Sequence, residues 1–363
     1  MVLLDPWGSV LLKDYEAIAK KFGLEDFDPT ALPEPNRLMR RGVVFASRDF
    51  GRIRECIKQR KRYYALTGIM PTAERIHLGT KMVLENMAWF QEHGAKAYVL
   101  VADLEAAATR GISLAEARKW AMSFHIPAYI ALGLDPRRTV FYFQSENKAV
   151  MNLAYEFAKK ITLAEFRAIY GLATPATIMS ALTQAADILY PQLQARIPGV
   201  IPVGIDQDPH IRLVRDIVTR TKTAYGFIPP SAIYNKFTPG LDGSLKMSKS
   251  KPESMLELPE PQASVRRKLM NALTGGRDTL EEQRRLGGQP ESCMIFELYK
   301  QHFLEKEEEL NNIYRQCKAG SLLCGEDKRH ACEHMTRFLE GFEKRLSKAR
   351  KVVSKLKFIR FGR

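Results

Sequence analysis

Residues 71–80, Pro-Thr-Ala-Glu-Arg-Ile-His-Leu-Gly-Thr, separate two apolar stretches of different periodicity. Residues 63–67, Tyr-Tyr-Ala-Leu-Thr, come before them, and apolar residues at helical spacing come after them: Met82, Val83, Met87 and Phe90. This order predicts a strand, a turn and then a helix. The first amides of a helix have no partner within it and favour an anion. We therefore expect His77 to donate to a phosphate oxygen and Gly79 to let a nucleotide approach the backbone.

A second segment supplies positive charge. Residues 246–250 read Lys-Met-Ser-Lys-Ser, and they follow the turn-forming residues 238–243, Thr-Pro-Gly-Leu-Asp-Gly. Glycine and proline at this density predict a loop that can move. A lysine ammonium can follow a phosphoryl group as negative charge builds up on it, so the loop suits a polyphosphate ligand. Taken alone, such a string is more often a solvated loop, just as one His at a helix start is usually a cap.

Together, the two segments resemble the HIGH and KMSKS signatures of class I aminoacyl-tRNA synthetases. Residues 246–250, here called the KMSKS loop, match the second signature letter for letter. Residues 77–80, here called the HIGH-like segment, depart from the first because Thr80 stands where a second His is expected. Both segments would then bind the same nucleotide from opposite sides.

The resemblance implies a set of site residues for ATP and the Mg²⁺ that accompanies it. The expected nucleotide ligands in these two regions are Pro71, Thr72, His77, Gly79, Met247, Ser248, Lys249 and Ser250. The residues expected to be catalytic are His77, Thr80, Lys246 and Lys249.

Two further segments narrow the resemblance to one amino acid. Residues 183–189, Thr-Gln-Ala-Ala-Asp-Ile-Leu, and residues 203–216, which contain Asp-Gln-Asp-Pro-His, resemble tryptophanyl-tRNA synthetases of the archaeal and eukaryotic branch. Tyrosyl enzymes carry a Gln and an Asp in this region but not the second string. The resemblance covers nearly the whole chain. It implies that Gly204 and Asp206 hold the ribose of ATP, and that tryptophan is bound by Glu105, Gln184 and Gln207.

The residue pattern by itself also predicts a ligand site in this region, but it does not identify the ligand. Residues 200–204 read as a short apolar strand, with Asp206 and Gln207 at its end before a helix opened by Pro209. In an open parallel sheet, ligands bind at the carboxyl ends of the strands. Without the family, Gln184 could equally be an exposed helix glutamine.

Composition limits the class of protein. The chain has 363 residues, of which 27% are charged and 45% hydrophobic, which suits a soluble protein of two domains. We see no signal peptide and no apolar run long enough to span a membrane, so we expect a cytoplasmic location. Five cysteines, an odd number, suit a reducing compartment. A formal net charge of +15 suggests a polyanionic partner, although a solvated basic surface would explain it too.

The order of elements predicts an α/β fold, with a Rossmann-like doubly wound parallel sheet in the catalytic domain and an α-helical C-terminal region. That region resembles the family's α-helical anticodon-binding domain. Further strands are expected at residues 97–103 and 139–143, and capping boxes at Ser113 and Thr162. We expect an appended N-terminal region at 1–60 and a catalytic domain at 61–260, whose helical insertion at about 146–190 is too short to edit. A helical domain at 261–348 and a basic helix at 349–363 would follow.

The C-terminal end is strongly basic. Residues 344–363 contain nine Lys or Arg and no Asp or Glu. Such a run is usually a solvated helix face, but beside an RNA-binding domain it favours contact with phosphates. We expect Lys351, Lys355 and Lys357 to bind tRNA.

Three cysteines raise the question of a metal. Cys293, Cys317 and Cys324 resemble three of the four cysteines that bind an iron–sulfur cluster in some bacterial and archaeal tryptophanyl enzymes, and the fourth position is Asp327. Three thiolates and a carboxylate could hold a cluster or zinc, yet buried helical cysteines are the commoner outcome.

The expected reaction is ATP-dependent activation of tryptophan to its adenylate, followed by transfer to tRNA(Trp), and the family implies a homodimer. The alternatives are a tyrosyl-specific enzyme, a small-molecule nucleotidyltransferase, and a catalytically silent RNA-binding paralogue. Thr80 favours the last, together with Leu66 and Leu100, which stand where eukaryotic members carry Tyr and Gln that contact tryptophan.

Overall fold

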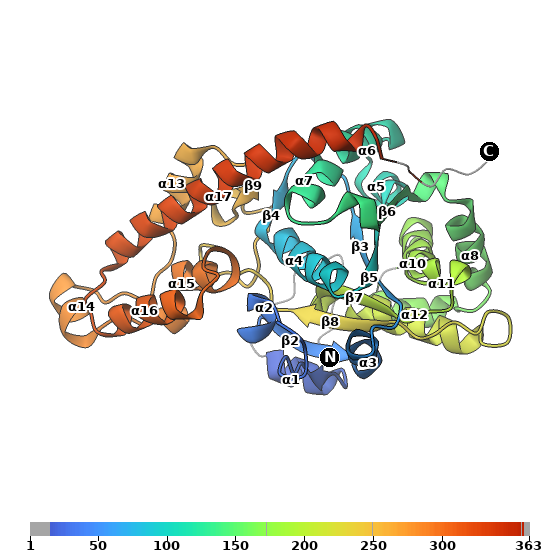
Figure 1. Cartoon of the computed structure of the whole chain (residues 1–363), viewed down its shortest axis with the longest axis horizontal. Coiled ribbons are helices and arrows are strands. Elements are labelled where there is room, and N and C mark those ends of the chain that lie inside the picture. The colour runs from blue at the N-terminus through green and yellow to red at the C-terminus, as the bar shows by residue number, and fades with distance from the viewer. Residues whose placement is uncertain (1–14, 172, 249, 357, 359–363) are drawn as a thin grey trace. The chain divides into compact units, whose positions relative to one another are not determined.

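The computed structural model describes residues 15–171, 173–248, 250–356 and 358. The chain divides into two compact units (Figure 1). The first comprises Met1–Glu74, Val83–Lys236 and Lys348–Arg363, and the second comprises Arg75–Met82 and Phe237–Ser347. The HIGH-like segment therefore belongs to the same unit as the KMSKS loop, although a long stretch of sequence separates them.

A seven-stranded sheet forms the core of the first unit, in the order β1-β2-β8-β7-β3-β5-β6. Its strands are β1 (Glu25–Asp26), β2 (Val44–Arg48), β3 (Tyr63–Ile69), β5 (Ala95–Val101), β6 (Thr139–Phe143), β7 (Gly199–Gly204) and β8 (Ser231–Asn235). The five strands from β8 to β6 are parallel, whereas β2 joins β8 and β1 joins β2 antiparallel. The sheet reverses its winding at β3, which lies between β7 and β5, so the carboxyl ends of these strands form a switch point where ligands bind.

Helices cover both faces of this sheet, which confirms the doubly wound fold class. Alternate residues of a strand point to opposite faces. Tyr63 donates to the carbonyl of Phe90 in α4 (Leu78–Glu92), at 3.1 Å, and Tyr64 donates to the carbonyl of Ile188 in α10 (Pro175–Leu189), at 2.7 Å. The tyrosine rings thus fasten one helix to each face.

The N-terminal residues extend the sheet instead of forming a layer of their own. Ser47 of β2 lies opposite Ile233 of β8, so this segment closes one edge of the sheet. The boundary expected at residue 60 therefore does not separate it from the sheet. The helices of this region are α1 (Tyr15–Lys21), α2 (Arg37–Arg40) and α3 (Gly51–Lys58).

Local signals in the sequence placed several elements of the first unit correctly. The capping boxes at Ser113 and Thr162 are present, and β6 has the expected bounds. The helix that begins after Ser113 runs through a π-helical turn, η1 (Ala121–His125). The remaining helices of this unit are α5 (Asp103–Arg110), α6 (Leu114–Trp120), α7 (Ile126–Ala131), η2 (Pro136–Arg138), η3 (Gln144–Glu146), α8 (Lys148–Ala158), α9 (Leu163–Tyr170), α11 (Pro191–Gln194), η4 (Ile205–Gln207) and α12 (Asp208–Arg220).

The second unit is helical apart from one small sheet, in which β4 (Ile76–His77) pairs antiparallel with β9 (Glu257–Leu258). As expected, β9 is the last strand among the described residues. The helices are η5 (Pro252–Ser254), α13 (Gln262–Met270), α14 (Leu280–Leu286), η6 (Pro290–Ser292), α15 (Met294–Leu298), η7 (Tyr299–Phe303), α16 (Glu307–Lys318) and α17 (Cys324–Val353).

The last helix is longer than the sequence suggested. α17 is one continuous helix of 30 residues, so a separate basic helix does not begin at residue 349. Its first part belongs to the second unit and its end to the first. Within the described ranges, no helix combines the length and apolarity needed to cross a membrane.

Candidate active site

The HIGH-like segment is shaped by a contact between two of its own residues. His77 ends the strand β4, and its Nδ1 accepts the backbone N–H of Gly79 at 3.1 Å. A Cβ on residue 79 would lie 2.9 Å from the same nitrogen, so only glycine leaves room for the imidazole. Because Nδ1 accepts, the proton of the neutral ring is on Nε2, which can donate to a phosphate oxygen. Gly79 therefore serves His77 directly, a role that the sequence did not predict.

The turn before this segment is held by the π-helical turn η1. His125 Nε2 lies 2.7 Å from the carbonyl oxygen of Ala73, and the hydroxyl of Ser123 donates to Glu74 at 2.6 Å. Pro71 and Thr72, two of the expected ATP ligands, lie immediately before these anchored residues in the first unit.

The described part of the KMSKS loop is also anchored by neighbouring residues. Lys246 places its ammonium 5.2 Å from the centre of the Phe237 ring, which is a cation–π contact. Met247 is buried, and its N–H donates to the carbonyl of Thr238 at 2.9 Å. The hydroxyls of Ser248 and Ser250 lie 2.8 Å apart. Lys249, the other expected catalytic lysine, lies outside the described residues.

The turn before the KMSKS loop is closed by backbone bonds. Gly240 N–H donates to the carbonyl of Ser244 at 2.8 Å, and Gly243 adopts φ +79°, a left-handed conformation suited to glycine. Partial burial opposes ionisation of Asp242, but hydrogen bonds from Ser244 and Lys251 lower its pKa to about 2. The Asp242–Lys251 ion pair, at 3.0 Å, closes the loop from its far side.

The expected tryptophan ligands lie at the carboxyl edge of the first unit's sheet. Glu105 is in α5, which follows β5, while Gln207 ends η4, which follows β7. Gln184 of α10 reaches Gln207, with the side-chain amide nitrogen and oxygen 3.5 Å apart. Gly204 and Asp206, the expected ribose ligands, stand at the end of β7 and in η4. The edge thus brings Gln184 and Gln207 together.

Asp187 is a candidate that the sequence reasoning missed. It is fully buried, one helical turn after Gln184, and it accepts hydrogen bonds from Tyr142 at 2.9 Å and Gln144 at 2.6 Å. Burial raises its pKa to about 8 against those two hydrogen bonds, and the charges of Glu105 and Asp103 add to the rise. The i, i+3 spacing from Gln184 was the available signal, because it places both side chains on one face of α10.

Tyr142, which donates to Asp187, lies on a sheet face that also carries apolar residues. Leu100 lies opposite Gly68 and Tyr142 on neighbouring strands, so these residues and Leu66 share one sheet face. Gln144 Oε1 is buried and has no hydrogen-bond partner among the described residues. This combination suits an aromatic ring that carries a single N–H donor.

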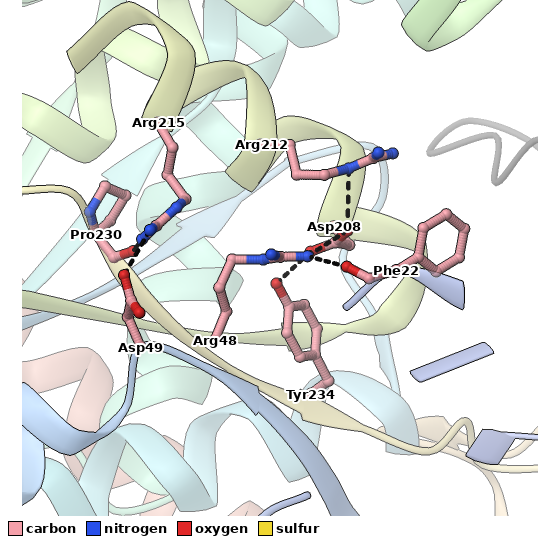
Figure 2. A network of polar contacts seen from close by, with 8 residues as sticks. All are labelled: Phe22, Arg48, Asp49, Asp208, Arg212, Arg215, Pro230 and Tyr234. Carbon is pink, nitrogen blue, oxygen red and sulfur yellow. Dashed lines mark hydrogen bonds and ion pairs between the residues drawn. The ribbon is translucent and has the colours of Figure 1, made fainter. Parts of the chain in front are cut away.

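The Asp-Gln-Asp-Pro-His string also has a structural part, drawn in Figure 2. Asp208 is fully buried and accepts hydrogen bonds from Arg48 at 2.9 Å and Tyr234 at 2.6 Å, and it pairs with Arg212 at 3.1 Å. His210 is buried as well, and burial lowers its pKa to about 3. Asp208 therefore fixes α12 to the sheet, and His210 links α12 to α9, because its Nδ1 lies 2.8 Å from the Tyr170 hydroxyl.

The C-terminal end combines packed and exposed side chains. Phe358 places its ring 5.6 Å from that of Phe143 in β6, and Arg350 Nε donates to the carbonyl of Ser123 at 3.2 Å. Lys351 and Lys355 are exposed, as RNA-binding side chains must be, while Lys357 lies outside the described residues.

The three cysteines show no arrangement for a metal. Among the described residues, no group of three or more His, Cys, Asp or Glu side chains is placed to hold a metal ion. Burial, with help from Cys293, Asp327 and Cys324, raises the pKa of the Cys317 thiol to about 11. As arranged here, these residues do not fit an iron–sulfur cluster or zinc.

The sheet, the two signatures and their anchors are those of a class I synthetase, and a family model described as tRNA synthetases class I (W and Y) matches residues 58–340. The tryptophan–tRNA ligase of Aeropyrum pernix is 44% identical over 97% of both chains, and that of Hyperthermus butylicus is 43% identical over 96% of this chain and 95% of its own. The chain belongs to the tryptophan–tRNA ligase family.

A solved structure supports the same family assignment. The crystal structure of the Aeropyrum pernix tryptophanyl-tRNA synthetase matches with a TM-score of 0.90 and 44% identity, covering 98% of this chain and 100% of that one.

Proposed function

We propose that the chain activates L-tryptophan with ATP and transfers it to tRNA(Trp) in protein biosynthesis. The observation that carries this proposal is the joint presence of both ATP signatures and the Asp-Gln-Asp-Pro-His string in a chain similar along its whole length to tryptophan–tRNA ligases. The tyrosyl alternative is not favoured, because the relatives from Aeropyrum pernix, Hyperthermus butylicus and Methanocaldococcus jannaschii are all tryptophan–tRNA ligases.

The chemistry requires no covalent enzyme intermediate. The tryptophan carboxylate attacks the α-phosphate in line, so the protein positions the reactants and neutralises charge on the leaving pyrophosphate. Lys246 and Lys249 would neutralise that charge. His77 Nε2–H and Thr80 would hold the triphosphate, with Pro71, Thr72 and Gly79 beside them. Mg²⁺ bound with ATP supplies further neutralisation.

The amino-acid side would be recognised by fixed polar groups. Gln184 and Gln207, which contact each other, would bind the amino and carboxylate ends of tryptophan, and Glu105 would face the substrate. We add Asp187 as the acceptor for the indole N–H, supported by its full burial and by its contact with Tyr142, which shares a sheet face with Leu66 and Leu100. Gly204 and Asp206 would hold the ribose.

tRNA binding, the oligomeric state, the location and a metal site are separate questions. The exposed Lys351 and Lys355, with the net charge of +15, support tRNA binding at the end of α17. A homodimer is proposed from the family alone, and a cytoplasmic location is proposed from the sequence. A metal at Cys293, Cys317 and Cys324 is not proposed, because the described side chains are not arranged to hold one. Iron and zinc analysis of anaerobically purified protein decides that point.

Pyrophosphate exchange with each amino acid tests the proposal. Tryptophan should drive exchange, and tyrosine should be at least about 10⁴-fold poorer, because a site with a buried polar partner for one substrate group rejects analogues that lack it. Equal exchange with tyrosine would make the enzyme tyrosyl-specific. No exchange with any amino acid, from protein that still binds tRNA, would favour the silent paralogue.

A further inference from the structure

The π-helical turn η7, between α15 and α16 of the second unit, places two polar side chains in a buried setting. Gln301 and His302 are each 2% exposed. Buried polar groups require partners, and π-helical turns are rare and often occur at functional sites. The partners of these two residues lead to the ATP signatures.

His302 is linked to the KMSKS loop through one residue. Its Nε2 lies 2.9 Å from the hydroxyl of Thr238, which is itself buried. The carbonyl of Thr238 accepts the N–H of Met247 at 2.9 Å. A change at His302 therefore reaches the KMSKS loop through two successive hydrogen bonds.

A parallel link passes through the neighbouring residue. The side-chain amide of Gln301 lies 3.5 Å from the carbonyl of Phe237, at the limit of a hydrogen bond. The ring of Phe237 is the surface over which the Lys246 ammonium rests. The two adjacent residues of η7 thus hold the two residues on which Lys246 and Met247 depend.

The same turn also holds α4, the helix that begins within the HIGH-like segment. The buried ammonium of Lys81 lies 3.4 Å from the carbonyl oxygen of His302 and 5.3 Å from the centre of the Phe338 ring in α17. Met82 Sδ lies 3.8 Å from the Thr238 hydroxyl. Residues next to both ATP signatures therefore meet at His302.

We propose that His302 is a positioning residue that fixes the KMSKS loop against the start of α4 through Thr238. A satisfied core histidine alone would not explain why both its ring and its carbonyl bind residues that flank the two signatures. Small displacements of a charge that stabilises the transition state reduce the rate strongly, so loss of this anchor should slow catalysis without weakening tryptophan binding. This kinetic consequence rests on the proposed function.

The test uses Thr238→Val, His302→Leu and the double variant, with Thr336→Val on α17 as the matched control. Thr238→Val is nearly isosteric, so it remains informative if His302→Leu does not fold. Trypsin cleavage after Lys246 and Lys249, followed by mass spectrometry, reports loop opening without any substrate. Opening that costs about 1 kcal/mol less should raise this cleavage roughly fivefold. Thr336→Val should leave it unchanged.

The kinetic arm measures adenylate formation in single turnovers. We expect a roughly tenfold slower rate in each single variant, an unchanged KM for tryptophan, and no further loss in the double variant, because one path is broken twice. Unchanged cleavage and an unchanged rate in Thr238→Val would overturn the proposal, and so would additive losses in the double variant. Failure of the wild-type chain to activate any amino acid would instead refute the function and leave the cleavage result standing.

Discussion

The ion pairs of Asp208 and of Asp242 differ in how deeply they are buried. Asp208, beside the expected tryptophan and ribose ligands, is fully buried and bound by three side chains. Asp242 and Lys251, which close the KMSKS loop, are 41% and 57% exposed. Breaking a buried pair typically costs about 3–5 kcal/mol, whereas an exposed pair contributes about 0–1 kcal/mol.

This difference matches what each region has to do. The ends of an amino acid must be held in one place throughout the reaction, and a packed, fully bonded edge of a sheet does that. The charge on a leaving pyrophosphate grows only during the reaction, so the lysines that follow it belong on a loop with a low cost of opening. Anchoring through buried Thr238 then limits how far such a loop moves.

The largest effect should come from the buried carboxylate. Asp208→Ala leaves Arg48 and Tyr234 without their acceptor, and we expect the free energy of unfolding to fall by about 3–5 kcal/mol. Urea denaturation measures it. Asp216→Ala, on the exposed face of the same helix, should change stability by less than about 0.5 kcal/mol. If Asp208→Ala and Asp216→Ala lowered the free energy of unfolding equally, burial would not explain the role of Asp208.

Lys249→Ala tests the loop. Because Lys249 is expected to act on the transition state, single-turnover adenylate formation at saturating ATP and tryptophan should slow by about 10²- to 10³-fold. The KM for ATP should shift little, and stability should not change. A normal rate constant with a raised KM would mean that this lysine only binds ATP.

Asp187→Asn tests the buried acid at the carboxyl edge of the sheet. Since burial raises the pKa of Asp187 from 3.8 to about 8, the wild type is stabilised by the protonated form below pH 3.8 and loses that stability as pH rises towards 8. The difference in unfolding free energy between wild type and variant should therefore fall by up to about 1.4 kcal/mol per pH unit in that window. Denaturation at several pH values measures it, and parallel curves would refute the raised pKa.

The smallest effect is expected at the exposed end of α17. Lys351→Ala and Lys355→Ala should each lower the slope of log affinity for tRNA against log salt by about one, while tryptophan activation stays normal. An unaltered slope in the double variant would assign these charges to solubility.

The parts of the fold that could be predicted are those encoded locally. Ser113 and Thr162 each carry their partner three residues on, so the capping boxes were visible, and the bounds of β6 followed from its apolar run. The pairing of β2 with β8 was not visible, because it joins segments about 190 residues apart and no local periodicity records it.

The site residues also divide into those that the local sequence indicates and those that depend on contacts between distant segments. His77 and the KMSKS lysines stand in contiguous motifs, so they could be predicted from the sequence and from its resemblance to the family. The strand pairing of His77 with Glu257 and the contact of Gln144 with Asp187 depend on the folded chain. Asp187 lies at i+3 from Gln184 in the sequence. Only its burial and its hydrogen-bond partners in the folded chain distinguish it from an ordinary helix aspartate.

The uninterrupted length of α17 limits how this chain can change in evolution. Each residue added to a helix turns everything after it by about 100° and advances it by about 1.5 Å. A single insertion between Asp327 and Phe338 would turn the Phe338 ring away from the Lys81 ammonium, while the Asp327 carbonyl stays bonded to the Tyr299 hydroxyl. Related sequences should therefore vary in length at their loops, and α17 should accept insertions only in sets close to whole helical turns.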